Sequence, residues 1–274
     1  MCFRYNGVRM MHPAVLPQII NWRWLWLTTA SLLAGGINAV AGGGSFLLFP
    51  AIMSMRVLPV QANATNSVAL WPGQFTSIVA YWKDIRKNLR HAWPLALAGF
   101  LGGSAGALIL LHTPQRSFLY IVPWLLLGAA LLFAISGPVS RQLALRRSAA
   151  TGPAHRRRLP VFLAALAVCF YIGYFGAGAG FLIITMLSLS GWQDMHEINA
   201  LKVVAITLAR GMAILMFVVS GQVVWRYCAL AMVICAAAGY ISAHNAHRIP
   251  QRILRTAVVC IGFGMSIWFF VRTP

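Results

Sequence analysis

The chain is a series of long apolar runs separated by short polar segments. Six runs carry no charged residue and reach or exceed the ~20 residues that a membrane-spanning helix needs: 24–55, 57–82, 92–115, 117–140, 159–193 and 227–246. Two more apolar runs follow the same pattern, at 198–225, where Lys202 and Arg210 are the charged residues, and at 256–271. This pattern predicts an all-α integral membrane protein with about eight hydrophobic segments.

Two of these runs are too long for one upright crossing. A straight helix over residues 24–55 would be about 48 Å long, against a hydrocarbon core of about 30 Å. Each long run also contains a glycine cluster, GGGS in the first and GAGAG in the second. Irregular backbone at membrane depth needs surrounding protein or a water-filled cavity, so the clusters predict a broken or re-entrant helix. In the next run, 57–82, Pro72 predicts a kink.

The two glycine clusters belong to an internal repeat. FGAGAGFLI matches VAGGGSFLL at a shift of 135 residues, which pairs Gly178 with Gly43. INALKVVAI matches ANATNSVAL at a shift of 136, which pairs Lys202 with Asn66, and IPQRI matches TPQRS at the same shift. Several matches in one order indicate a duplication.

The repeat divides the chain into four parts. These are an N-terminal segment (1–23), a first transmembrane repeat (24–140), a basic cytoplasmic linker (141–158) and a second transmembrane repeat (159–274). Parallel and inverted arrangements of the two repeats both remain open, because each distributes the basic residues similarly between the two sides.

Composition and charge support a membrane protein. Hydrophobic residues make up 60% of the chain and charged residues 9%. The net charge of +19 comes mainly from basic residues between the apolar runs, which is the positive-inside pattern and argues against nucleic acid as a partner. The five cysteines form no CxxC pair, so no metal or redox site is expected from them.

The glycine clusters are the first candidate binding residues. A helix that restarts after such a cluster presents unpaired N–H groups and the positive end of its dipole, which suit a small anion. Close helix packing through small residues is the alternative role. The candidates are Gly42, Gly43, Gly44 and Ser45 in the first half and Gly176, Gly178 and Gly180 in the second.

Polar residues at the start of the following segment are the second group: Asn63 and Asn66 in the first half, and Asn199, Lys202 and Arg210 in the second. Helix capping is an alternative role for one asparagine, and Lys202 could instead extend to the membrane interface. The chain has only three acidic residues, Asp84, Asp194 and Glu197. A buried Lys202 or Arg210 therefore has few carboxylate partners, and an anionic substrate would supply the missing charge.

Motifs of catalysis are missing from the sequence. It contains no HExxH, no GxSxG, no P-loop lysine and no cysteine beside a histidine, so we expect no catalytic residue, no metal site and no cofactor.

Four segments, INAVAGGGSFLLFPAI, LPVQANATNSVALWPG, GYFGAGAGFLI and INALKVV, resemble the TauE/SafE sulfite exporter family of prokaryotic permeases. The resemblance extends from about Leu32 to Phe270. It implies a multi-pass secondary transporter of the bacterial inner membrane that moves sulfite or an organosulfonate. Lys202 and Arg210 depart from the first-half pattern and leave the exact anion open.

We therefore expect a permease that works by alternating access around a site between the two glycine breaks. Its partners would be a small anionic substrate and the lipid bilayer, and a homo-oligomer remains open. The alternatives are an anion channel with the same pore, and a membrane scaffold in which the glycines only pack helices.

Overall fold

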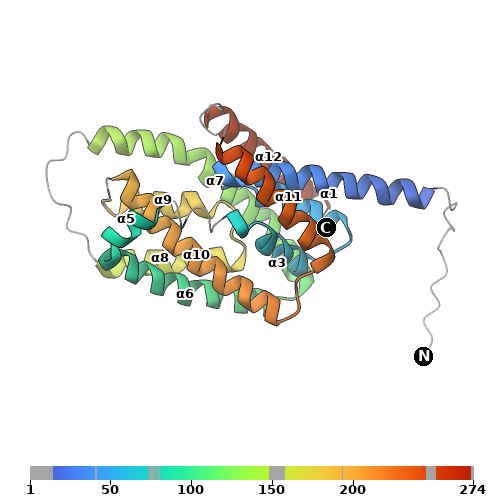
Figure 1. Cartoon of the computed structure of the whole chain (residues 1–274), viewed down its shortest axis with the longest axis horizontal. Coiled ribbons are helices and arrows are strands. Elements are labelled where there is room, and N and C mark those ends of the chain that lie inside the picture. Colours follow the sequence, from blue (N-terminus) through green and yellow to red (C-terminus); the bar gives the residue numbers. More distant parts are fainter. Residues whose placement is uncertain are drawn as a thin grey trace.

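The computed structural model describes residues 15–40, 42–73, 78, 81–147, 158–192, 194–244 and 251–272, and every regular element in these ranges is a helix (Figure 1). In chain order the helices are α1 (Val15–Val40), α2 (Ser45–Ser54), α3 (Pro59–Ala69), α5 (Trp82–Lys87), α6 (Leu89–His112), α7 (Gln115–Arg147), α8 (Arg158–Tyr174), α9 (Ala179–Leu189), α10 (Met195–Val219), α11 (Trp225–His244) and α12 (Gln251–Arg272).

Among the described helices, four are long and apolar enough to cross a membrane: α6, the first 18 residues of α7, α10, and the first 18 residues of α11. Shorter apolar helices are α2, α9 and parts of α8 and α12. The molecule is thus an all-helical, multi-pass membrane protein. The expected total of about eight hydrophobic segments remains a prediction, because the two longest apolar runs are each divided between two helices.

The division falls at the glycine clusters. Helix α1 ends at Val40 and α2 begins at Ser45, while α8 ends at Tyr174 and α9 begins at Ala179. Gly42 and Gly176 adopt φ values of 76° and 74°, in the left-handed region that favours glycine. The Gly42 amide donates to the Ile37 carbonyl at 3.1 Å, which closes the last turn of α1. After each break the chain turns back, and α2 packs against α1 as α9 packs against α8.

The next apolar run in the first half is interrupted as well. A kink was expected at Pro72, but α3 ends at Ala69, before Trp71 and Pro72. Proline disfavours helical backbone at the residue that precedes it, which explains a complete helix end here. In the second half α10 continues unbroken to Val219.

The helices form two packed groups. In one, α6 lies against both α8 and α10 (Figure 1). In the other, α11 lies against both α1 and α3, while α7 pairs with α12. Glycines allow the closest approaches: Gly103 of α6 contacts Ala209 of α10, and Gly35 of α1 contacts Cys235 of α11. These glycines lie outside the two clusters, and their role is close packing of helices.

The predicted linker, residues 141–158, begins inside α7, which continues to Arg147. Residues 148–157 lie outside the described part of the chain.

Candidate functional site

The second glycine break is held by three side chains that bond its carbonyl groups. Asn63 Nδ2 donates to the Tyr174 carbonyl at 3.0 Å, and Arg210 Nη2 donates to the Gly176 carbonyl at 2.7 Å. The Tyr171 hydroxyl donates to the Ala177 carbonyl at 2.8 Å. These bonds satisfy buried carbonyl groups at the end of α8 and in the irregular backbone that follows it. Asn63 comes from α3, so the first half of the chain takes part in the second break.

Arg210 lies in the middle of α10 and is only 5% exposed. Beyond its bond to Gly176, its Nε is buried without a partner. The one ion pair of the described residues joins His91 and Glu197, so no carboxylate there offsets the Arg210 charge. A guanidinium in this position can stabilise a negative charge brought by a ligand.

Around the first break, Ser45 opens α2 and its Oγ lies 3.2 Å from Asn66 Nδ2 of α3. Both side chains are buried. The first turn of α2 closes with the Phe46 amide on the Gly43 carbonyl at 3.2 Å, so the N–H groups before Phe46 fall at the free end of the helix. This helix start can donate to an anion.

The glycines of the two clusters have different surroundings. A Cβ at Gly44 would meet the Ala34 carbonyl and Asn38 of α1, so helix packing explains Gly44. A Cβ at Gly42 or Gly180 would meet no atom within 4 Å. Gly178 precedes α9 with a φ of 70°. Close packing therefore does not explain Gly42, Gly178 or Gly180; Gly42 and Gly178 are explained by their left-handed backbone.

Asn199 and Lys202 bond each other and not the glycine breaks. Lys202 Nζ donates to Asn199 Oδ1 at 2.9 Å, and the lysine is half-buried. Eight residues separate Lys202 from Arg210, a rise of about 12 Å along α10. The structure therefore does not bring the two cations to one contact.

The capping role considered for the asparagines is wrong. Leu58 occupies the N-cap of α3, and Asp194 caps α10 by accepting from the His196 amide at 2.8 Å. Asn63 and Asn66 lie inside α3, and Asn199 lies inside α10.

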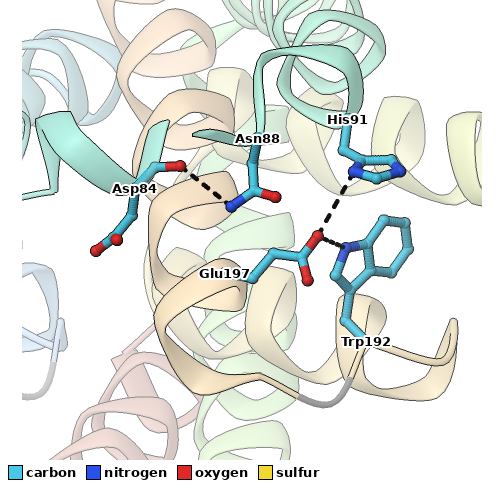
Figure 2. A network of polar contacts seen from close by, with 5 residues as sticks. All are labelled: Asp84, Asn88, His91, Trp192 and Glu197. Carbon is cyan, nitrogen blue, oxygen red and sulfur yellow. Dashed lines mark hydrogen bonds and ion pairs between the residues drawn. The ribbon is translucent and has the colours of Figure 1, made fainter. Parts of the chain in front are cut away.

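Two features were missed from the sequence. Tyr171 sits in an apolar run with no polar neighbour to mark it. A polar cluster also joins the start of α6 to the start of α10, as Figure 2 shows: Glu197 accepts from Trp192 Nε1 at 3.0 Å and lies 3.5 Å from His91 Nδ1. Beside it, Asn88 Nδ2 donates to the Asp84 carbonyl at 3.1 Å. Because these residues come from separate segments, only the fold reveals the cluster.

Comparison with known proteins places the chain among membrane transporters. It is 24% identical over 245 residues to a probable membrane transporter protein of Haemophilus influenzae, which covers 88% of this chain and 91% of that protein. It is 25% identical over 268 residues to the probable membrane transporter protein YfcA of Escherichia coli, which covers 96% and 92%. A relative of the same description from Sinorhizobium is 28% identical over 208 residues, covering 73% of this chain and 74% of that protein.

No solved structure matches the chain. The family model described as sulfite exporter TauE/SafE matches residues 27–269. The chain is a membrane transporter, and it belongs to the TauE/SafE sulfite exporter family.

Proposed function

We propose that this protein is a secondary transporter for a small anion, sulfite or an organosulfonate, in the bacterial inner membrane. The observation that carries the proposal is Arg210, a buried cation that bonds an interrupted helix and has no carboxylate partner in the described part of the chain. Keeping such a charge costs free energy unless a ligand offsets it. An anion bound at the break would do so.

The site lies where the two glycine breaks approach through α3. Asn66 bonds Ser45 at the first break, and Asn63 bonds the Tyr174 carbonyl at the second. The backbone donors would come from Gly43, Gly44 and Ser45 at the first break and from Gly178 and Gly180 at the second. The amides of Gly42 and Gly176 already donate to the Ile37 and Tyr171 carbonyls, so these two glycines would shape the breaks without donating to the anion. Asn199 and Lys202 would lie at the edge of the site, nearer the start of α10 than Arg210.

We further propose that the chain is an inverted repeat of two halves with eight hydrophobic segments. Equivalent helices begin at Pro59 and Met195, Leu89 and Trp225, and Gln115 and Gln251, each pair at the 136-residue shift of the sequence match. Each half also packs against the first helix of the other half. Helix α6 of the first half lies against α8, and its counterpart α11 in the second half lies against α1. In Figure 1, α1 runs leftward from its N-terminal end and α8 runs rightward, which supports inversion. The α1–α2 and α8–α9 pairs would be re-entrant hairpins.

Alternating access would then move one helix group against the other around the site. The α6–α8–α10 group has an apolar cluster of its own, and the ends of these three helices also pack into the cluster of α1, α3 and α11 through Ala107, Tyr174 and Ala213, where the rocking motion would have to slide.

Counterflow of radiolabelled sulfite in proteoliposomes tests the proposal. We expect saturable exchange by the wild type and its loss in Gly43→Leu, where a large side chain would enter a buried break. Flux without saturation or counterflow would favour an anion channel. No flux of any anion, with one dominant partner in a pull-down, would favour a scaffold.

A further inference from the structure

The side chain of Asn63 has one unpaired hydrogen-bond acceptor, and the Tyr174 carbonyl beside it shows which of the two amide atoms this is. The side-chain amide lies 3.0 Å from the Tyr174 carbonyl oxygen, which can only accept a hydrogen bond. The Nδ2 atom must therefore face Tyr174, and the remaining atom is Oδ1. That oxygen is buried without a partner on a residue that is 1% exposed. Buried acceptors are nearly always paired, so this one needs a donor.

Asn66 repeats the arrangement one turn along α3. Residues three apart lie on one face of a helix, and Asn66 is also 1% exposed. Its amide contacts Ser45 Oγ at 3.2 Å, and its Oδ1 has no partner. Because the Ser45 hydroxyl can donate or accept, the Asn66 amide could turn over, but either orientation leaves one of its polar atoms unpaired. The face of α3 toward the two breaks thus presents at least one unpaired acceptor.

A cation would satisfy unpaired oxygens, but the charges around them oppose it. Arg210 bonds Gly176, two residues after the carbonyl that holds Asn63. Helix α2 starts at Ser45, beside Asn66, and presents the positive end of its dipole there. The three acidic residues lie elsewhere: Asp84 is in the first turn of α5, Asp194 caps α10, and Glu197 contacts Trp192 and His91. The donor is then a water molecule or an O–H or N–H group of a ligand, and the positive charges favour a ligand that is itself negatively charged.

We infer that the site takes an oxyanion that keeps at least one O–H or N–H group. That group donates to Asn63 Oδ1, while the deprotonated oxygens accept from Arg210 and from the N–H groups at the start of α2. A fully deprotonated anion of the same shape leaves Asn63 Oδ1 unpaired and places an oxygen against it. The inference rests on the proposed anion site and narrows its substrate class.

A matched pair of probes tests the inference. Methylphosphonate and methanesulfonate have the same shape, and at mildly acidic pH both are monoanions, but only methylphosphonate keeps an O–H group. Their binding to the purified full chain is measured as the anion concentration that gives half of the maximal rise in the thermal unfolding midpoint. We expect methylphosphonate to act at concentrations about 10- to 100-fold lower, the worth of one hydrogen bond to a charged ligand.

Asn63→Leu should reduce this preference to about one, because it removes the acceptor at nearly constant size. Asn88→Leu is the control, since it makes the same chemical change at an amide that also donates to a backbone carbonyl, outside the site. It should keep the preference. If Asn63→Leu does not fold, the preference of the wild type and its decrease in Asn66→Leu test the same point.

Equal binding of the two probes by the wild type, or tighter binding of methanesulfonate, overturns the inference. Stabilisation by sodium ions that is lost in Asn63→Leu overturns it in favour of a cation site. If sulfite counterflow is present without a donor preference, only this inference fails. If neither probe binds and no counterflow occurs, the proposed function fails with it.

Discussion

Replacing Arg210 with leucine should greatly weaken anion exchange while changing the stability of the fold much less. Within the described part of the chain the guanidinium has one hydrogen bond, from Nη2 to the Gly176 carbonyl at 2.7 Å, and its Nε has none. It is buried in α10 without a carboxylate partner among the described residues. Leucine removes both the bond and the charge.

The two effects on stability oppose each other. Loss of a hydrogen bond from a charged donor to the buried Gly176 carbonyl costs about 1.5–3 kcal/mol. Removal of a buried, unpaired charge relieves a desolvation penalty of several kcal/mol. We therefore expect the free energy of unfolding of Arg210→Leu to stay within about 2 kcal/mol of the wild type.

For anion exchange, no second effect opposes the loss of the Arg210 charge. A charge-assisted bond to the anion, worth about 1.5–3 kcal/mol, corresponds to about 10- to 150-fold in affinity. The assay is the initial rate of radiolabelled sulfite counterflow below saturation, with equal amounts of reconstituted protein. Arg210→Lys serves as the matched variant, because it keeps the charge but lacks the planar fork that can hold Gly176 and an anion together. Its rate should lie between those of the wild type and the leucine variant.

Wild-type exchange by Arg210→Leu would refute the reasoning, since the charge would then have no role in binding. A leucine variant that loses its thermal transition along with exchange would also contradict it. In that case the bond to Gly176 would be needed for the fold, and the exchange rate of a folded Arg210→Lys variant would decide whether the charge acts on the anion.

Four other variants test Lys202, the second glycine cluster and the packing of α6 against α10. Lys202→Ala should weaken counterflow while leaving membrane insertion intact, and full activity would remove Lys202 from the site. Gly178→Ala forces a β-carbon onto a backbone with a φ of 70°, a cost of roughly 1–2 kcal/mol, so its unfolding midpoint should fall; Gly180→Ala, where a Cβ meets no atom within 4 Å, should keep the wild-type midpoint. Gly103→Leu should reduce the yield of folded protein, because the new side chain would collide with the backbone of Ala209; a normal yield would mean that α6 and α10 can separate without loss.

Local sequence signals predicted the helical membrane class and the two helix ends at the glycine clusters. The uncharged runs predicted the apolar parts of α6, α7 and α11, and the run with Lys202 and Arg210 predicted α10, because mainly apolar residues suit the hydrocarbon core. The glycine clusters coincide with the gaps that follow Val40 and Tyr174. Pro72 could also have predicted the end of α3 at Ala69, because a proline disfavours helical backbone at the residue before it.

Contacts between distant segments could not be predicted in this way. The bond from Asn63 to the Tyr174 carbonyl joins positions 111 residues apart and depends on how the helices pack. Helix periodicity says which residues share a face, but not which break that face meets. Capping was an alternative role for one of the candidate asparagines because it follows from a local rule, but the cap of α10 is Asp194.

The two halves contribute different polar groups to the proposed site, so affinity and selectivity for anions should depend on different residues. At positions paired by the repeat, Asn66 bonds Ser45, whereas Lys202 bonds Asn199. The buried charge at the breaks comes from Arg210 in the second half, while the unpaired acceptor comes from Asn63 in the first. Charge acts on every anion alike, but an acceptor distinguishes anions with a donor from those without. Variants at Arg210 should therefore shift the affinities for methylphosphonate and methanesulfonate by the same factor, whereas variants at Asn63 should change their ratio. If both sets of variants change the ratio, charge and acceptor act on the anion as one unit, and affinity and selectivity are not separable in this site.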